Sequence, residues 1–166
     1  MGLSLLTRDR SLRRTVLTSP VHFVAFGFGS GLVAKAPGTA GTLLAVPIYA
    51  LLAQLPVLAY LAVVVLATAF GVWLCGESAK RLGVHDHGGI VWDEFVGYWI
   101  TMLFVPLSVV WMVTGFMLFR LFDIWKPWPV SIADKNVGGG LGIMLDDVLA
   151  GIYAAVVLHI IIYLQG

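Results

Sequence analysis

The feature that most restricts the fold is an uncharged apolar run from Val57 to Cys75. A helix needs about 20 apolar residues to cross the hydrocarbon core of a bilayer, with a range of roughly 17 to 25, and this run meets that length. Val148 to Leu164 nearly meets it, with His159 as its only strongly polar residue. Charged residues make up 11% of the chain, against about a quarter in soluble proteins. The chain is therefore predicted to be an integral membrane protein.

Shorter apolar segments predict two helical hairpins. Gly41 to Leu55 ends just before a proline and forms the first arm of a hairpin with the long apolar run. Ile90 to Val105 and Leu107 to Phe119 form the second hairpin, broken at Pro106, because proline suits a turn better than a helix interior. His22 to Ala34 is apolar but rich in glycine, and we expect it to lie against the membrane.

These segments together predict an all-α fold, a polytopic membrane helical bundle with about five crossings. Residues 1–19 are expected to be a basic cytoplasmic segment, and residues 20–166 a single membrane-embedded domain. All ten Lys and Arg residues fall in the N-terminal segment, around Lys35, at Lys80-Arg81 or between Arg120 and Lys135. The hairpin tips carry no charge, so the positive-inside rule assigns every basic segment to the cytoplasm and leaves Gly166 on the opposite side.

Several classes of partner and site are disfavoured by composition. A formal net charge of only +1 gives no argument for binding nucleic acid. Cys75 is the only cysteine, which excludes a disulfide framework and a two-cysteine metal site. The partner we expect from composition is the lipid bilayer.

Two acidic doublets, Asp93-Glu94 and Asp146-Asp147, sit inside apolar sequence. Burying an ionised carboxylate without a partner is expensive, so something positive must accompany them. Oxygen-only ligands favour a hard divalent cation, and we predict Mg²⁺ bound by these four residues. An alternative is that the carboxylates lie at a helix start and are stabilised by the helix dipole alone. Adjacent residues on a helix point about 100° apart, so only one residue of each doublet can face a given direction.

Basic side chains that could bind a phosphate lie near the acidic residues in the sequence. Arg120 and Asp123 are three residues apart, so they are neighbours on a helix, and a local ion pair is the simpler interpretation. Arg120 is nevertheless the better phosphate ligand, because its guanidinium can bind two oxygens at once. Lys126 either extends toward the membrane surface or binds a substrate phosphate.

Glycine-rich segments on either side of Lys35 are a further candidate for phosphate binding. They comprise residues 26–32 and residues 36–42, and the second contains Thr39. Glycines allow backbone amides to approach a phosphate, while hydroxyls and a lysine add donors and charge. The alternative is a helix-packing surface of small residues, which is common in membrane proteins.

The run His85-Asp86-His87 resembles a metal-binding tract, but His-X-His points its side chains apart on a helix. Two interpretations of these three residues stay open: direct ligation of a metal, or a polar loop that lies, with Asp134, at the mouth of the acidic site.

Three functions are compatible with this pattern. Carboxylates together with Arg and Lys at the cytoplasmic surface suit metal-assisted displacement at phosphorus. A transporter that uses intramembrane acids is the second, although the charges gather at one face and no duplicated half is apparent. The third is a non-catalytic lipid-binding protein, which would leave both carboxylate doublets without a role.

The motifs resemble those of the phosphatidylglycerophosphatase A family. The matching motifs are Gly27-Phe28-Gly29-Ser30-Gly31, Pro37-Gly38-Thr39, residues 84–88, Ile90 to Phe95, the highly specific stretch Arg120 to Pro129, and Gly142 to Asp147. The resemblance implies a helical, Mg²⁺-dependent lipid phosphatase of the bacterial inner membrane with its active site facing the cytoplasm. Such an enzyme converts phosphatidylglycerophosphate to phosphatidylglycerol and phosphate. Asp93, Glu94, Asp123 and Asp147 are then the expected catalytic residues, and Lys35, Thr39, Arg120 and Lys126 the expected phosphate ligands.

Overall fold

The computed structural model describes the backbone of residues 2–128, 130 and 137–165, and side chains from residue 10 onward. Every regular element in this part of the chain is helical, which confirms the predicted all-α class. In chain order the elements are α1 (Gly2–Thr18), α2 (Pro20–Ala25), the 3₁₀ segment η1 (Gly27–Leu32), α3 (Pro37–Leu52), α4 (Val57–Leu82), α5 (Trp92–Thr101), α6 (Val109–Trp125) and α8 (Gly139–Gln165).

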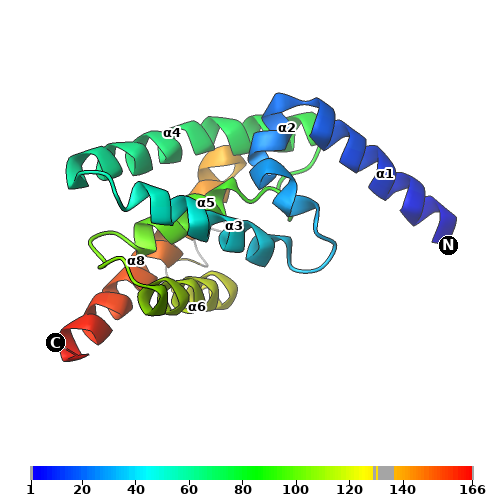
Figure 1. Ribbon diagram of the computed structural model, residues 1–166. Coiled ribbons are helices and arrows are strands. Elements are labelled where there is room, and N and C mark those ends of the chain that lie inside the picture. The colour runs from blue at the N-terminus through cyan, green and yellow to red at the C-terminus, as the bar shows by residue number, and fades with distance from the viewer. Residues whose placement is uncertain (1, 129, 131–136, 166) are drawn as a thin grey trace.

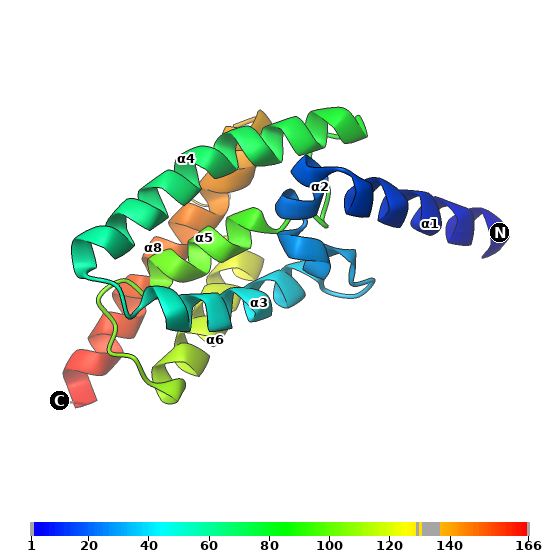
Figure 2. The ribbon, with the colours of Figure 1, turned by 45° about the horizontal axis from the view of Figure 1, so that its top comes forward.

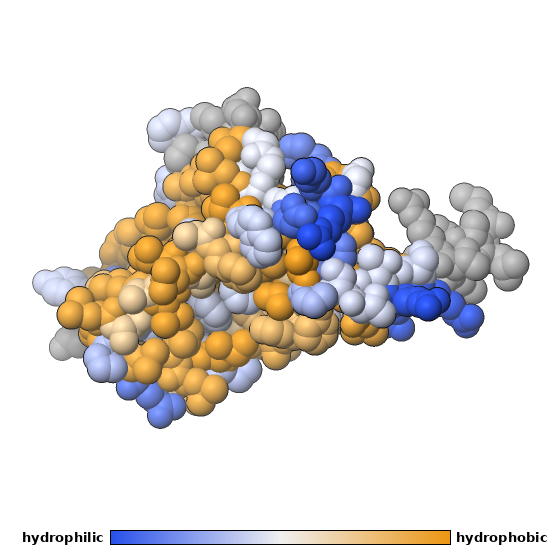
Figure 3. Space-filling view, turned by 90° about the horizontal axis from the view of Figure 1, so that it is seen from above, coloured by the Kyte–Doolittle hydropathy of each residue, from blue (hydrophilic) through white to orange (hydrophobic). Residues whose placement is uncertain are grey.

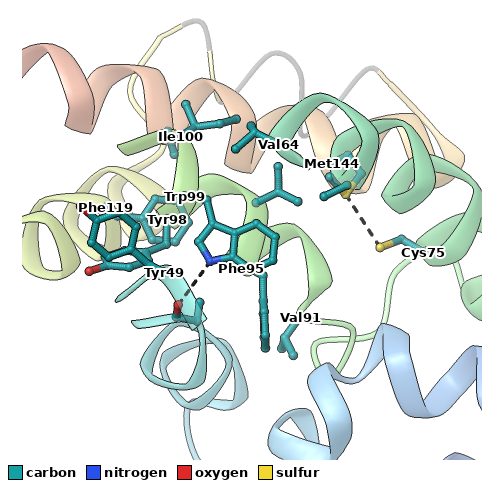
Figure 4. Packing of buried hydrophobic residues seen from close by; sticks show 14 of the residues in the cluster. Tyr49, Val64, Cys75, Val91, Phe95, Tyr98, Trp99, Ile100, Phe119 and Met144 are labelled. Atoms are coloured by element: carbon teal, nitrogen blue, oxygen red, sulfur yellow. Dashed lines mark hydrogen bonds between the residues drawn. The ribbon is translucent and has the colours of Figure 1, made fainter. Parts of the chain in front are cut away.

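The short helix α5 lies at the centre of the bundle. It packs against α3, α4, α6 and α8, and both ribbon views show it between them (Figures 1 and 2). All of its residues from Glu94 to Thr101 are buried. Its side chains therefore contact other helices on every side. Figure 4 shows three of these side chains, Phe95, Tyr98 and Trp99, among the buried residues of the core.

Close packing of α8 against α5 depends on glycine. A β-carbon on Gly151 would lie 2.5 Å from the carbonyl oxygen of Gly97. Such small-residue contacts let helix backbones approach closely, as they commonly do in membrane bundles. This approach brings the acidic doublets of α5 and α8 together.

Two helices in the described part of the chain, α4 and α8, are long and apolar enough to cross a membrane. This is fewer than the roughly five crossings predicted. The helices α3, α5 and α6 do form near the expected segments, but they have 16, 10 and 17 residues. At about 1.5 Å per residue, α5 covers roughly half of a hydrocarbon core about 30 Å thick. Its apolarity reflects enclosure by protein as well as any contact with lipid.

The bundle has one charged end and one apolar end. The start of α3, the end of α4 and α1 lie toward one side of Figures 1 and 2, and the α3–α4 and α5–α6 turns lie toward the other with the C-terminus. Apolar side chains cover most of the face in Figure 3, and strongly hydrophilic residues gather mainly toward the side from which α1 extends. Exposed apolar residues on α4 and α8, including Leu66 and Ile160, fit contact with lipid.

Candidate active site

Glu94 lies in the first turn of α5, where its carboxylate is buried. Its Oε2 accepts hydrogen bonds from Nη1 of Arg120 on α6 and from Oγ1 of Thr42 on α3, the latter at 2.6 Å. Three helices that are distant in sequence therefore converge on one carboxylate.

Arg120 binds a second carboxylate as well. Its Nη1 lies 2.7 Å from Oδ2 of Asp123, one helical turn along α6. This is the local ion pair that the sequence spacing predicts, and Glu94 adds a partner from another helix. The Arg120 side chain is only 14% exposed, so its charge is compensated mainly by these two carboxylates and little by solvent.

Lys126 ends α6 in an unusual backbone conformation. Its φ of 46° lies in the left-handed region, which costs a residue with a side chain about 1 kcal/mol or more. In this conformation its Nζ lies 2.6 Å from Oδ2 of Asp146 on α8. Such strain tends to persist where the surrounding structure fixes it, often at functional sites.

The two residues of each acidic doublet have different neighbours, because adjacent residues on a helix point in different directions. Both aspartates of α8 are buried, but Asp146 pairs with Lys126, whereas Asp147 lies within electrostatic range of Asp93, Asp123 and Glu94. Asp93 lies within electrostatic range of Asp146 and Asp86. Burial raises the pKa of Asp93 well above its usual range, and the neighbouring charge of Glu94 raises it further. Burial also raises the pKa of Glu94, against the opposing effect of Arg120.

The donor chemistry of this site suits a hard cation. Five carboxylates, those of Asp93, Glu94, Asp123, Asp146 and Asp147, share the charged end of the bundle with the two bases Arg120 and Lys126. The excess of negative charge and the oxygen-only donors fit Mg²⁺. Within the described residues, however, no three His, Cys, Asp or Glu side chains are already arranged around one point. Binding an ion would require side chains now paired with Arg120 or Lys126 to turn.

The first turn of α3 forms a wall of the same site. A β-carbon on Gly38 would lie 1.8 Å from Oε1 of Glu94, so only glycine allows this approach. Thr39, a predicted phosphate ligand, is half-buried on this turn. Lys35, just before the helix, is exposed and makes no ion pair among the described residues.

The predicted site mouth is only partly assembled. His85 and Asp86 are exposed and line a pocket together with Asp146. His87 turns elsewhere: its Nδ1 accepts a hydrogen bond from the Gly89 amide at 3.0 Å, and its ring packs on Phe26. Asp134 lies outside the described residues.

The glycine-rich segment at residues 27–31 packs against other parts of the protein. A β-carbon on Gly31 would lie 1.9 Å from the carbonyl oxygen of Gly89, and one on Gly27 would lie 2.8 Å from both Val91 and Phe95. These contacts favour the helix-packing interpretation over phosphate binding for these two glycines.

Two buried polar contacts were not predicted from the sequence. Thr42 lies in a glycine-rich segment but was not expected to contact Glu94. The sequence does place Thr42 one helical turn after Gly38, and residues four apart share a helical face, so a helix at this position directs both toward the same side. His22 and Ser78 also form a buried hydrogen bond of 2.9 Å between α2 and α4. Burial, helped by Arg81, lowers the pKa of His22, which suits a structural contact.

Comparison with known proteins identifies relatives over nearly the whole chain. The sequence model of the family described as phosphatidylglycerophosphatase A matches residues 23–162. The chain is 48% identical to phosphatidylglycerophosphatase A of Escherichia coli K12 over 155 residues, which cover 93% of this chain and 90% of that protein. It is 46% identical to phosphatidylglycerophosphatase A of Haemophilus influenzae, over 95% of this chain and 98% of that protein.

A third relative carries a different name. A Bacteroides thetaiotaomicron protein, provisionally named a phosphatidylinositol-3-phosphatase, is 42% identical over 86% of this chain and 94% of its own length. No solved structure matches the chain.

Proposed function

Because the chain belongs to the phosphatidylglycerophosphatase A family, we propose that it hydrolyses phosphatidylglycerophosphate to phosphatidylglycerol and inorganic phosphate. The observation that carries the proposal is the buried group of Glu94, Arg120 and Asp123, with Asp147 beside it. Such a cluster of buried charge is costly unless a ligand completes it.

The basic residues supply the phosphate-binding groups. Arg120 and Lys126 now hold carboxylate oxygens, and each can exchange such a partner for a phosphoryl oxygen of the substrate. The free amides in the first turn of α3, near Thr39, and the exposed Lys35 add further donors. Together they orient the phosphomonoester at the charged end of the bundle.

The carboxylates of Asp93, Glu94, Asp146 and Asp147 would hold Mg²⁺, with Asp123 close by. When bound, this ion neutralises charge on the phosphate and lowers the pKa of a bound water. A carboxylate at the site accepts the proton of the attacking water, the bond from phosphorus to the glycerol oxygen breaks, and the leaving oxygen gains a proton. The products are an alcohol and inorganic phosphate.

The reaction would take place at the cytoplasmic face of the inner membrane. Lys80 and Arg81 lie at the charged end of α4, and Trp125 and Trp128 are exposed beside Lys126. Indoles and basic side chains are typical of the headgroup layer, and basic loops are typical of the cytoplasmic side. Accessibility of a cysteine introduced at Arg81, in intact cells and in inside-out vesicles, tests this orientation; labelling from outside would contradict it.

The test of function is phosphate release from a panel of lipids in detergent micelles. Phosphatidylglycerophosphate should be the preferred substrate, compared with phosphatidic acid and with phosphatidylinositol-3-phosphate, which the name of the Bacteroides relative suggests. The Asp147→Asn variant serves as the inactive control. Preference for another lipid would correct the substrate, and no release from any of them would refute the phosphatase proposal.

A further inference from the structure

The fully buried Thr42 has two oxygen atoms within reach of its hydroxyl. Its Oγ1 lies 2.6 Å from Oε2 of Glu94 and 2.9 Å from the carbonyl oxygen of Gly38. A hydroxyl has one proton, so it donates to one of these oxygens at a time. The shorter contact is to the carboxylate, where a charge-assisted hydrogen bond is stronger than one to a neutral carbonyl.

Gly38 contacts the other oxygen of the same carboxylate. A β-carbon at this position would lie 1.8 Å from Oε1 of Glu94 and 3.2 Å from Nη1 of Arg120. The first turn of α3 thus meets Glu94 at both oxygens, with Thr42 at Oε2 and the Gly38 backbone at Oε1. A side chain at residue 38 would displace the carboxylate from Arg120.

We propose that Thr42 is a positioning residue for catalysis, which fixes the Glu94 carboxylate against the wall of the site formed by the first turn of α3. The proposal rests on the phosphatase function given above. Glu94 has three rotatable side-chain bonds, and Arg120 can fall back on Asp123 as its other partner. Without the Thr42 hydroxyl, the Glu94 carboxylate is free to turn within the site, and the geometry required for reaction is populated less often.

Thr42→Val removes the hydroxyl and keeps the shape of the side chain. A hydrogen bond to a charged group has a strength equivalent to roughly a 10- to 100-fold change in rate. We therefore expect kcat for phosphate release to fall by about this factor, with KM changed less than about threefold. Thr42→Ser restores the donor and should recover most of the lost kcat.

Thr101→Val is the matched control. Thr101 is also fully buried, and its hydroxyl lies 2.9 Å from the carbonyl oxygen of Gly97, at the opposite end of α5 from Glu94. Its loss should lower the unfolding temperature and leave kcat per folded molecule within about twofold of wild type. If Thr42→Val lowers kcat no more than Thr101→Val does, Thr42 has only a structural role and the proposal is overturned.

A second measurement needs no substrate. Thr42→Val, Glu94→Ala and the double variant form a cycle for unfolding in detergent, and residues in direct contact give non-additive shifts. Additive shifts would overturn the proposal whichever lipid is the substrate. Failure of the phosphatase function would instead appear in the wild-type protein, as no phosphate release from any lipid of the panel.

Discussion

At the carboxyl end of α5 the buried polar groups are neutral, and each has a backbone carbonyl as its partner. The Tyr60 hydroxyl donates to the carbonyl of Trp99 at 2.8 Å, and the Trp99 indole donates to the carbonyl of Ala45 at 3.3 Å, a contact drawn in Figure 4. Tyr98 donates to the carbonyl of Met112. These contacts are complete within the protein and need no ligand.

At the amino end of the same helix most of the buried polar groups are charged. Glu94 and Asp123 share Arg120, Asp146 has Lys126, and Asp93 and Asp147 add further negative charge. Neutral pairs stabilise a fold at little cost, whereas clustered carboxylates repel one another and lose hydration. We therefore propose that the carboxyl end serves stability and that the amino end serves chemistry.

The largest expected effect is at the carboxylates. Asp147→Asn and Glu94→Gln should each lower turnover of phosphatidylglycerophosphate on the order of 10³-fold or more. Asp147→Asn should remain folded, because it removes repulsion with Asp93. Steady-state kinetics on purified protein measures the loss, with Glu77→Gln as the control, because Glu77 pairs with Arg81 on its own helix. If Asp147→Asn retained more than about a tenth of wild-type turnover, the amino end would not be the catalytic end.

An intermediate effect is expected at Arg120. If its guanidinium binds substrate phosphate in both ground and transition states, Arg120→Lys should raise KM by roughly tenfold and also lower kcat. Arg120→Ala should in addition lower stability, because Glu94 and Asp123 lose their shared base. The double variant with Asp123→Ala separates the two roles. An unchanged KM in the single and double variants would restrict Arg120 to charge neutralisation.

The smallest effect is expected at the carboxyl end of α5. Tyr60→Phe leaves the Trp99 carbonyl without this donor and should lower the free energy of unfolding by about 1 kcal/mol. Turnover should stay within about twofold of wild type. Thermal unfolding and kinetics of the same preparation check both statements. A large loss of turnover without a loss of stability would break the distinction between the two ends.

The sequence predicts where most of the helices form, but not whether protein or lipid surrounds each of them. The apolar runs that became α4 and α8 are evident from hydropathy, and the pairing of Arg120 with Asp123 follows from helical spacing. The structure has two helices long and apolar enough to cross a membrane in its described part, fewer than the roughly five crossings predicted, and hydropathy does not distinguish burial in protein from burial in lipid. The enclosed helix α5 is the clearest case.

The contacts that assemble the site could not be predicted from spacing. Glu94 meets Arg120 across 26 residues and Thr42 across 52, and Lys126 meets Asp146 across 20. Such contacts depend on how helices pack, and close approaches such as Gly38 on Glu94 fix that packing. The residue types at the site could be identified from sequence, because buried carboxylates in apolar sequence are costly and therefore informative.

Metal dependence of phosphate release tests most directly the claim that the charged end of α5 is a cation-requiring active site. Purified protein in detergent micelles should release phosphate from phosphatidylglycerophosphate with Mg²⁺ present and lose that activity after chelation. Added Mg²⁺ should then restore it in the wild type and not in Asp147→Asn. Full activity in the chelated wild-type protein would contradict the account.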